Sequence, residues 1–177
     1  MKIAENGWIS GVRQIVTPHC DSRPAGTSID MLVIHNISLP PGEFGGSAIA
    51  GLFSGTLDTE AHPYYAQLRG VKVSAHFLIR RNGEIIQFVP CRKRAWHAGA
   101  SSWRGRTACN DFSLGVELEG SDFVPFEGAQ YKSLIRLTRR LRRVYPLQEI
   151  VGHADIAPGR KTDPGPHFDW PGYLAAL

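Results

Sequence analysis

The sequence lacks several features that would assign a chain to a familiar class at once. Its 177 residues contain no apolar run near the roughly 20 residues that a membrane-spanning helix needs. The three cysteines, Cys20, Cys91 and Cys109, are far apart and form no Cys-x-x-Cys pair, so neither a disulfide framework nor a thiolate zinc site is expected. There is no internal repeat and no low-complexity tract. These absences favour one globular domain over residues 1–177, with free thiols in a reducing compartment.

The first ten residues also lack the continuous apolar segment and small-residue cleavage site of a secretory signal, so a cytoplasmic location is expected. No membrane partner is expected, and the protein is expected to be a monomer. What the chain does have is a modest positive charge, +4 with a pI near 9.1, which favours an anionic substrate or partner. Much of it lies in Arg136, Arg139, Arg140, Arg142 and Arg143. These arginines form either a solvated helix face or a nucleic-acid patch. No motif or aromatic cluster supports the latter, so no nucleic-acid partner is expected.

Hydrophobic periodicity predicts a mixed α/β fold, with a central sheet of parallel and antiparallel strands and helices packed on it. The Asn-Gly pair within residues 75–89 indicates a hairpin, and Pro146 ends the long helix. Residues 95–110 are predicted to be irregular. The other expected elements are strands at 31–35, 112–120 and 148–153, and helices at 47–53, 127–145 and 171–177.

The strand expected at 112–120 has the clearest alternation in the chain. Leu114, Val116 and Leu118 share one face, and Glu117 and Glu119 share the other. The two carboxylates point either to solvent or into a cleft.

Two histidines, His35 and His153, end predicted strands and are the first candidates for a functional site. Ligand sites in α/β sheets lie beyond the carboxyl ends of strands, so the two imidazoles converge if their strands are neighbours. Asp163 follows in a segment, 151–166, that is rich in proline and glycine and is expected to be a shaped loop. Two histidines and a carboxylate form a familiar catalytic zinc set. Each histidine on its own is more often structural.

Other residues could complete such a site, and each has an ordinary alternative. Glu117 or Glu119 could act as general base beside an activated water, or could face solvent. Lys161 could stabilise an oxyanion, and Arg160 could pair with a substrate carboxylate, but both could be surface cations. Trp96 could stack on a sugar or belong to the core.

Five separated blocks resemble the AmpD family of bacterial 1,6-anhydro-N-acetylmuramoyl-L-alanine amidases, which are relatives of phage T7-type lysozyme and peptidoglycan recognition proteins. The blocks include Val33-Ile34-His35-Asn36-Ile37, Ala95-Trp96-His97-Ala98-Gly99 and Gly115-Val116-Glu117-Leu118-Glu119. They occur in order at residues 32–46, 73–81, 94–99, 115–120 and 152–166. The segment 100–108 agrees least with the family.

The resemblance implies a zinc amidase that cleaves the bond between muramic acid and L-alanine in muropeptides, during cytoplasmic peptidoglycan recycling. It implies that His35, His153 and Asp163 bind Zn2+, that Glu117 rather than Glu119 is the base, and that Lys161 stabilises the oxyanion. The residues expected to contact substrate are Trp96, His97, Asn36, Lys72 and Arg160. The alternative is a non-catalytic peptidoglycan-binding module on the same fold. The glycine- and proline-rich segment 40–63 is a candidate lid.

Overall fold

A six-stranded mixed sheet organises the chain, as a computed structural model of all 177 residues shows. Four neighbouring strands, β4, β9, β3 and β10, run parallel, β5 pairs antiparallel with β4, and β1 runs parallel to β5. The mixed sheet predicted from the sequence is confirmed. In spatial order the strands are β1 (Arg13–Gln14), β5 (Ile85–Gln87), β4 (Phe77–Ile79), β9 (Ser113–Glu119), β3 (Met31–Ile37) and β10 (Glu149–Gly152).

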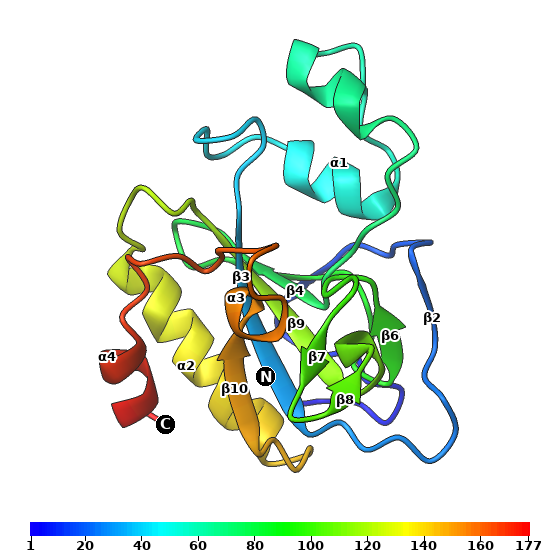
Figure 1. Cartoon of the computed structure of the whole chain (residues 1–177), viewed down its shortest axis with the longest axis vertical. Helices are drawn as coiled ribbons and strands as arrows, with labels where there is room; N and C mark the ends of the chain where they lie inside the picture. The colour runs from blue at the N-terminus through cyan, green and yellow to red at the C-terminus, as the bar shows by residue number, and fades with distance from the viewer.

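Helices and two small sheets surround this central sheet (Figure 1). Helices α2 and α4 lie along one side, the small strands β6, β7 and β8 lie on the other, and α1 stands above the carboxyl end of β3. No helix has both the length and the apolar character that crossing a membrane requires. The helices are α1 (Ala48–Ser54), α2 (Gly128–Arg142), α3 (His153–Ile156) and α4 (Trp170–Ala175), with 3-10 turns η1 (Pro63–Leu68) and η2 (Cys109–Asp111). The small sheets pair β2 (Cys20–Ser22) with β6 (Lys93–Ala95) and β7 (Ser102–Trp103) with β8 (Arg106–Thr107).

Strand β9 lies at the centre of the core, and all seven of its residues are buried. Leu114, Val116 and Leu118 pack in one apolar cluster with the inner face of α2, as their alternation predicts. The opposite face of β9 is also covered, by the ring of His97. A Cβ at Gly115 would lie 2.5 Å from the Cγ of His97, so only glycine allows this contact. The second face of β9 is therefore buried in the protein and is not a solvated surface.

The predicted hairpin is confirmed, with Leu78 paired to Ile86 across β4 and β5. Its turn contains Gly83 at φ +85°, a conformation that favours glycine. A Cβ there would also lie 2.8 Å from the backbone oxygen of Ala129 on α2. The turn residue therefore fixes how closely the hairpin and the helix approach.

Three predicted boundaries are wrong in detail. Helix α2 ends at Arg142 rather than 145, and Val144 is half exposed, because the residue before Pro146 is disfavoured in a helix. Residues 95–110 contain the small β7–β8 hairpin and are not wholly irregular. The segment 151–166 begins within β10 and includes the single-turn helix α3.

Arg23 joins several parts of the fold, although no pattern in the sequence marks it. Its guanidinium donates to the backbone oxygens of Asn110, Asp111, Cys91 and Ser113 at 2.7–3.2 Å. Burial lowers the pKa of Arg23 to about 10, so the group stays charged at neutral pH. One side chain thus ties the start of β9 to the η2 turn and to the segment between β5 and β6.

Replacing Arg23 with alanine is expected to lower the free energy of unfolding by about 3 kcal/mol or more, because four largely buried carbonyl groups lose a charged donor. Urea denaturation measures this change. Arg92→Ala is the matched control, since Arg92 is an exposed arginine in the connection between β5 and β6. Equal losses in both variants would contradict a bracing role for Arg23.

Candidate metal centre and active site

The register of three parallel strands brings the candidate site residues into one row. His35 on β3 lies opposite Glu117 on β9, and Ile34 lies opposite Gly152 on β10. His153 follows Gly152 directly, so it emerges beside His35. The expectation that two neighbouring strands deliver two imidazoles to one edge is confirmed.

Three potential ligand atoms converge at this edge. The Nδ1 atoms of His35 and His153 are 3.0 Å apart, and they lie 3.0 and 3.1 Å from the Oδ2 atom of Asp163. Tetrahedral zinc ligands at bond lengths of 2.0–2.1 Å lie about 3.3 Å from one another. The arrangement is therefore close to one face of a zinc coordination tetrahedron, and its fourth vertex is left for another ligand.

The second nitrogen of each imidazole has its own hydrogen-bond partner. Nε2 of His153 lies 3.2 Å from the carbonyl oxygen of Ala98, to which it can only donate, so the Nδ1 lone pair faces the centre. Nε2 of His35 lies 2.9 Å from Nδ1 of His97, and Nε2 of His97 lies 3.2 Å from Oγ of Ser113. Such partners fix the orientation and tautomer of metal-binding histidines.

The charge states of these groups also suit metal binding. Burial lowers the pKa of His35, although Asp163 acts in the opposite direction, so the neutral imidazole is favoured. Burial alone would raise the pKa of Asp163, but the close contacts with the imidazoles of His153 and His35 outweigh it and hold that pKa well below its usual range. Neutral imidazoles and an ionised carboxylate are the forms that bind a divalent metal.

Glu117 lies in the same cavity with an unpaired oxygen. It is buried, and its Oε2 atom has no hydrogen-bond partner. Burial, reinforced by the negative charge of Asp163, raises the pKa of Glu117 well above its ordinary value, while Lys161 opposes the shift. A buried carboxyl oxygen without a partner is costly, which indicates that it serves a bound molecule.

Glu119 is occupied elsewhere, although it lies on the same face of β9. Its carboxylate accepts from the backbone of Gly45 and Arg81 and forms an ion pair with Arg80 at 2.9 Å. It does not line the cavity that contains Glu117. The geometry therefore separates the two candidate bases.

The cavity has a volume of about 230 Å³ and includes most of the residues expected to contact substrate. Trp96 and His97 form part of its wall, and exposed Lys161 lies at its mouth. Asn36 also lines it. Its Nδ2 atom donates to Asp122 and to the carbonyl oxygen of Pro164, which leaves its Oδ1 atom available.

Two of the predicted substrate contacts lie outside this cavity. Lys72 is exposed and lines a separate hollow of about 170 Å³. Arg160 donates to the backbone oxygens of Ala98 and Ala100, so its guanidinium secures the loop that orients His153. Sequence reasoning missed Ala98 and Ser113 as supports of the two imidazoles, because a backbone oxygen and a lone serine carry no recognisable pattern.

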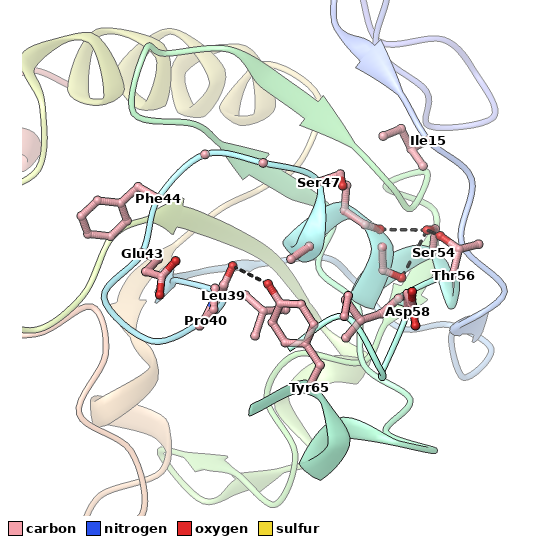
Figure 2. Close-up of a pocket in the computed structure, with 17 residues that line it drawn as sticks. Ile15, Leu39, Pro40, Glu43, Phe44, Ser47, Ser54, Thr56, Asp58 and Tyr65 are labelled. Atoms are coloured by element: carbon pink, nitrogen blue, oxygen red, sulfur yellow. Dashed lines mark hydrogen bonds between the residues drawn. The ribbon is translucent and has the colours of Figure 1, made fainter. Parts of the chain in front are cut away.

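A larger hollow of about 560 Å³ lies within the glycine- and proline-rich segment that follows β3 (Figure 2). It is formed by the loop from Leu39 to Ser47, by α1 and by the segment up to Tyr65. Figure 2 shows Tyr65 directed at the backbone of Leu39, with a hydroxyl-to-oxygen distance of 3.4 Å, and Phe44 directed away from the hollow. It shares no lining residue with the cavity around Glu117. Movement of this segment as a lid stays a prediction.

Comparisons with known proteins identify the family of this chain. Residues 25–166 match the family described as N-acetylmuramoyl-L-alanine amidase. The chain is 55% identical to the 1,6-anhydro-N-acetylmuramyl-L-alanine amidase AmpD of Escherichia coli K12, over 95% of this chain and 93% of that protein. A crystal structure of a selenomethionine AmpD derivative superposes with a TM-score of 0.95 at 53% identity and covers 98% of both chains.

A more distant solved structure contains a ligand. It is the E. coli amidase AmiD in complex with its substrate, anhydro-N-acetylmuramic acid-L-Ala-D-γ-Glu-L-Lys. Its TM-score is 0.61 at 35% identity, over 87% of this chain and 60% of that chain. The family match over most of the sequence, the full-length identity to AmpD and the shared fold show that this chain belongs to the N-acetylmuramoyl-L-alanine amidase family, with AmpD-type amidases among its near relatives.

Proposed function

We propose that this protein is a zinc-dependent amidase that hydrolyses the bond between 1,6-anhydro-N-acetylmuramic acid and L-alanine in muropeptides. The observation that carries the proposal is the meeting of three donor atoms from His35, His153 and Asp163 within 3.1 Å of one another. They adjoin the partnerless Glu117 oxygen in the same cavity. The activity named for AmpD, and the anhydromuramyl peptide bound by AmiD, support the choice of substrate.

The three donors fit Zn2+ better than Mg2+ or Ca2+, because two of them are imidazole nitrogens. The chemistry that a zinc ion supplies when bound is to acidify water and to polarise a carbonyl group. Glu117 takes the proton from the attacking water and later delivers a proton to the leaving amine of L-alanine. Lys161 stabilises the negative charge that develops on the carbonyl oxygen.

Binding of the substrate uses other walls of the cavity. Trp96 offers an aromatic face for the sugar, and Asn36 offers its free Oδ1 atom as an acceptor. Muropeptide stems carry carboxylates, which suits a chain of net charge +4. Lys72 and Arg160 lie outside this cavity, so we assign them to the outer part of the stem.

The proposed amidase domain extends beyond the matched residues 25–166 to both ends of the chain. Before residue 25, Ile9 packs in the main apolar cluster and Arg23 donates to the backbone of Asp111. After residue 166, Phe168 and Tyr173 pack in the same cluster. We place the protein in the cytoplasm as a monomer that recycles peptidoglycan, a location that suits three unpaired cysteines.

The acid limb of the pH–rate profile is expected to reflect Glu117. A general base acts only when ionised, and the pKa of Glu117 is raised well above 4.5, so activity is lost as pH falls through that raised value. Measuring kcat/KM between about pH 4 and 9, with zinc saturation verified at each pH, tests this. Glu119→Gln should keep the same limb. A limb centred at the ordinary glutamate pKa would contradict the assignment.

His97 is expected to orient the metal ligand His35, in addition to any contact that it makes with substrate. His97→Phe removes the acceptor that orients His35, so zinc affinity should fall by roughly 10- to 100-fold. Competition with a chromophoric zinc chelator measures this without any substrate. If His97→Phe kept its zinc affinity and raised only KM, the predicted role as a direct substrate contact would be favoured instead.

The proposed function is tested most directly by mass spectrometry of reaction products. Anhydro- and non-anhydro-muropeptides are incubated with the zinc-loaded protein, with and without a chelator. Release of free stem peptide that begins at L-alanine, and that stops when zinc is removed, is the expected result. Binding of muropeptide with stoichiometric zinc but no release would favour the non-catalytic alternative.

A further inference from the structure

Helix α2 carries a concentrated positive charge. It has five cationic residues and no acidic one, so it alone exceeds the net charge of the whole chain, +4. It contributes nothing to the cavity around Glu117. A quarter of the 20 lysines and arginines of the chain therefore lie on one helix away from the amidase site.

Four of these cations, together with Arg143 at the C-cap, line a groove of about 580 Å³. The groove lies between α2 and the two chain ends, from which Met1 and Ala176 contribute. Residues 132, 136, 139, 140 and 143 follow helical spacing, so they form one stripe. None of them takes part in an ion pair. The residues of α2 and its C-cap that line the groove are Lys132, Ile135, Arg136, Arg139, Arg140 and Arg143.

A purely solvated helix face does not account for this arrangement. The helix dipole favours cations in the last turn, which covers Arg139 and Arg140 but not Lys132 or Arg136, which lie about two turns and one turn earlier. Like charges three or four residues apart destabilise a helix, and no acidic residue offsets them here. The Nε atom of Arg140 is in addition buried without an acceptor. An anion in the groove offsets the repulsion between these cations.

We propose that this groove is a second binding site, for a small anion that carries several phosphate groups, such as a nucleoside triphosphate or an inorganic polyphosphate. Guanidinium groups bind phosphate oxygens in pairs, and four of them around one hollow match a multiply charged ligand. The volume lies in the range of small-molecule sites.

The lining argues against larger anionic partners. No aromatic side chain lines the groove, so it offers nothing on which nucleic-acid bases could stack. Its apolar residues, Ile135 and Met1, pack against the main core rather than project outward as a membrane-inserting face would. A compact phosphate anion is the occupant that these features favour.

Calorimetric titration of the zinc-loaded, full-length protein with inorganic tripolyphosphate, and with ATP, tests the proposal. The triple variant Arg136→Gln, Arg139→Gln, Arg143→Gln is compared with Arg142→Gln, which removes an exposed cation from the same helix but outside the groove. We expect saturable binding, a loss of about 100-fold or more in the triple variant and a change of less than about 3-fold in Arg142→Gln. Amidase activity at the wild-type level in both variants shows that they are folded.

Four results would overturn the proposal. They are no binding of tripolyphosphate, equal binding of citrate, an equal loss in Arg142→Gln, and binding of anionic vesicles or RNA without binding of tripolyphosphate. Because the phosphate titration uses no muropeptide, its failure leaves the proposed amidase function standing, and failure of that function leaves this site standing.

Discussion

Glu117→Gln is expected to lower kcat for muropeptide cleavage by about 10²- to 10⁴-fold and to leave zinc affinity nearly unchanged. The amide keeps the shape of the side chain but cannot take a proton from water. Glu117 makes no hydrogen bond through Oε2, so the substitution removes little from the apo structure. Single-turnover cleavage assays, together with a zinc titration on the same preparation, separate loss of chemistry from loss of metal.

Glu119→Gln is the matched control, because it changes the same chemical group two residues away on the same face of β9. Its carboxylate binds Arg80 and the backbone of Gly45, so the expected effect is on stability and on the loop after β3 rather than on the chemical step. A larger loss of kcat in Glu119→Gln than in Glu117→Gln would reverse the assignment of the base.

Asp163→Asn is expected to lower zinc affinity by about 100-fold or more, and activity with it, because the centre loses its only anionic donor. The same carboxylate oxygen lies 3.0 and 3.1 Å from the Nδ1 atoms of His35 and His153, so the change also alters the position of the two imidazoles. Removal of zinc from the unmodified protein with a chelator should abolish activity equally, and adding zinc should restore it in that protein alone. Equilibrium dialysis and product analysis measure the two effects.

Asp155→Asn tests whether any aspartate in this segment would behave alike. The Asp155 carboxylate accepts from the backbone N–H of Gly152 at 2.7 Å and does not face the centre. The amide oxygen of asparagine can still accept this hydrogen bond, so stability should change by less than about 1 kcal/mol and zinc affinity should be unchanged. Wild-type zinc affinity in Asp163→Asn would remove the basis of the proposed metal site.

The register of the central strands decided more about the site than any local pattern did. Periodicity in the sequence located β3, β9 and β10 to within a few residues, and it indicated that two of them carry histidine near their carboxyl ends. It could not show that the strands are neighbours in the order β9-β3-β10, because pairing depends on long-range contacts. The alignment of His35 with Glu117 follows from that pairing alone.

The side-chain environments were less predictable. Glu117 and Glu119 look alike in the sequence, and only the closeness of Arg80 and Gly45 shows that Glu119 is engaged in the structure. His97 was expected to contact substrate. It lines the cavity, and its ring also contacts His35, in space that the absence of a side chain at Gly115 leaves open. Arg160, expected to face substrate, instead secures the loop around Ala98.

The sequence by itself determined the fold class, the main elements and the set of chemically able side chains, because periodicity, turn residues and residue type are local properties. The tertiary structure alone decided which of those side chains meet and which carboxylate stays without a partner. Those properties arise from strand pairing, burial and packing between segments far apart in the chain, and no local pattern encodes them.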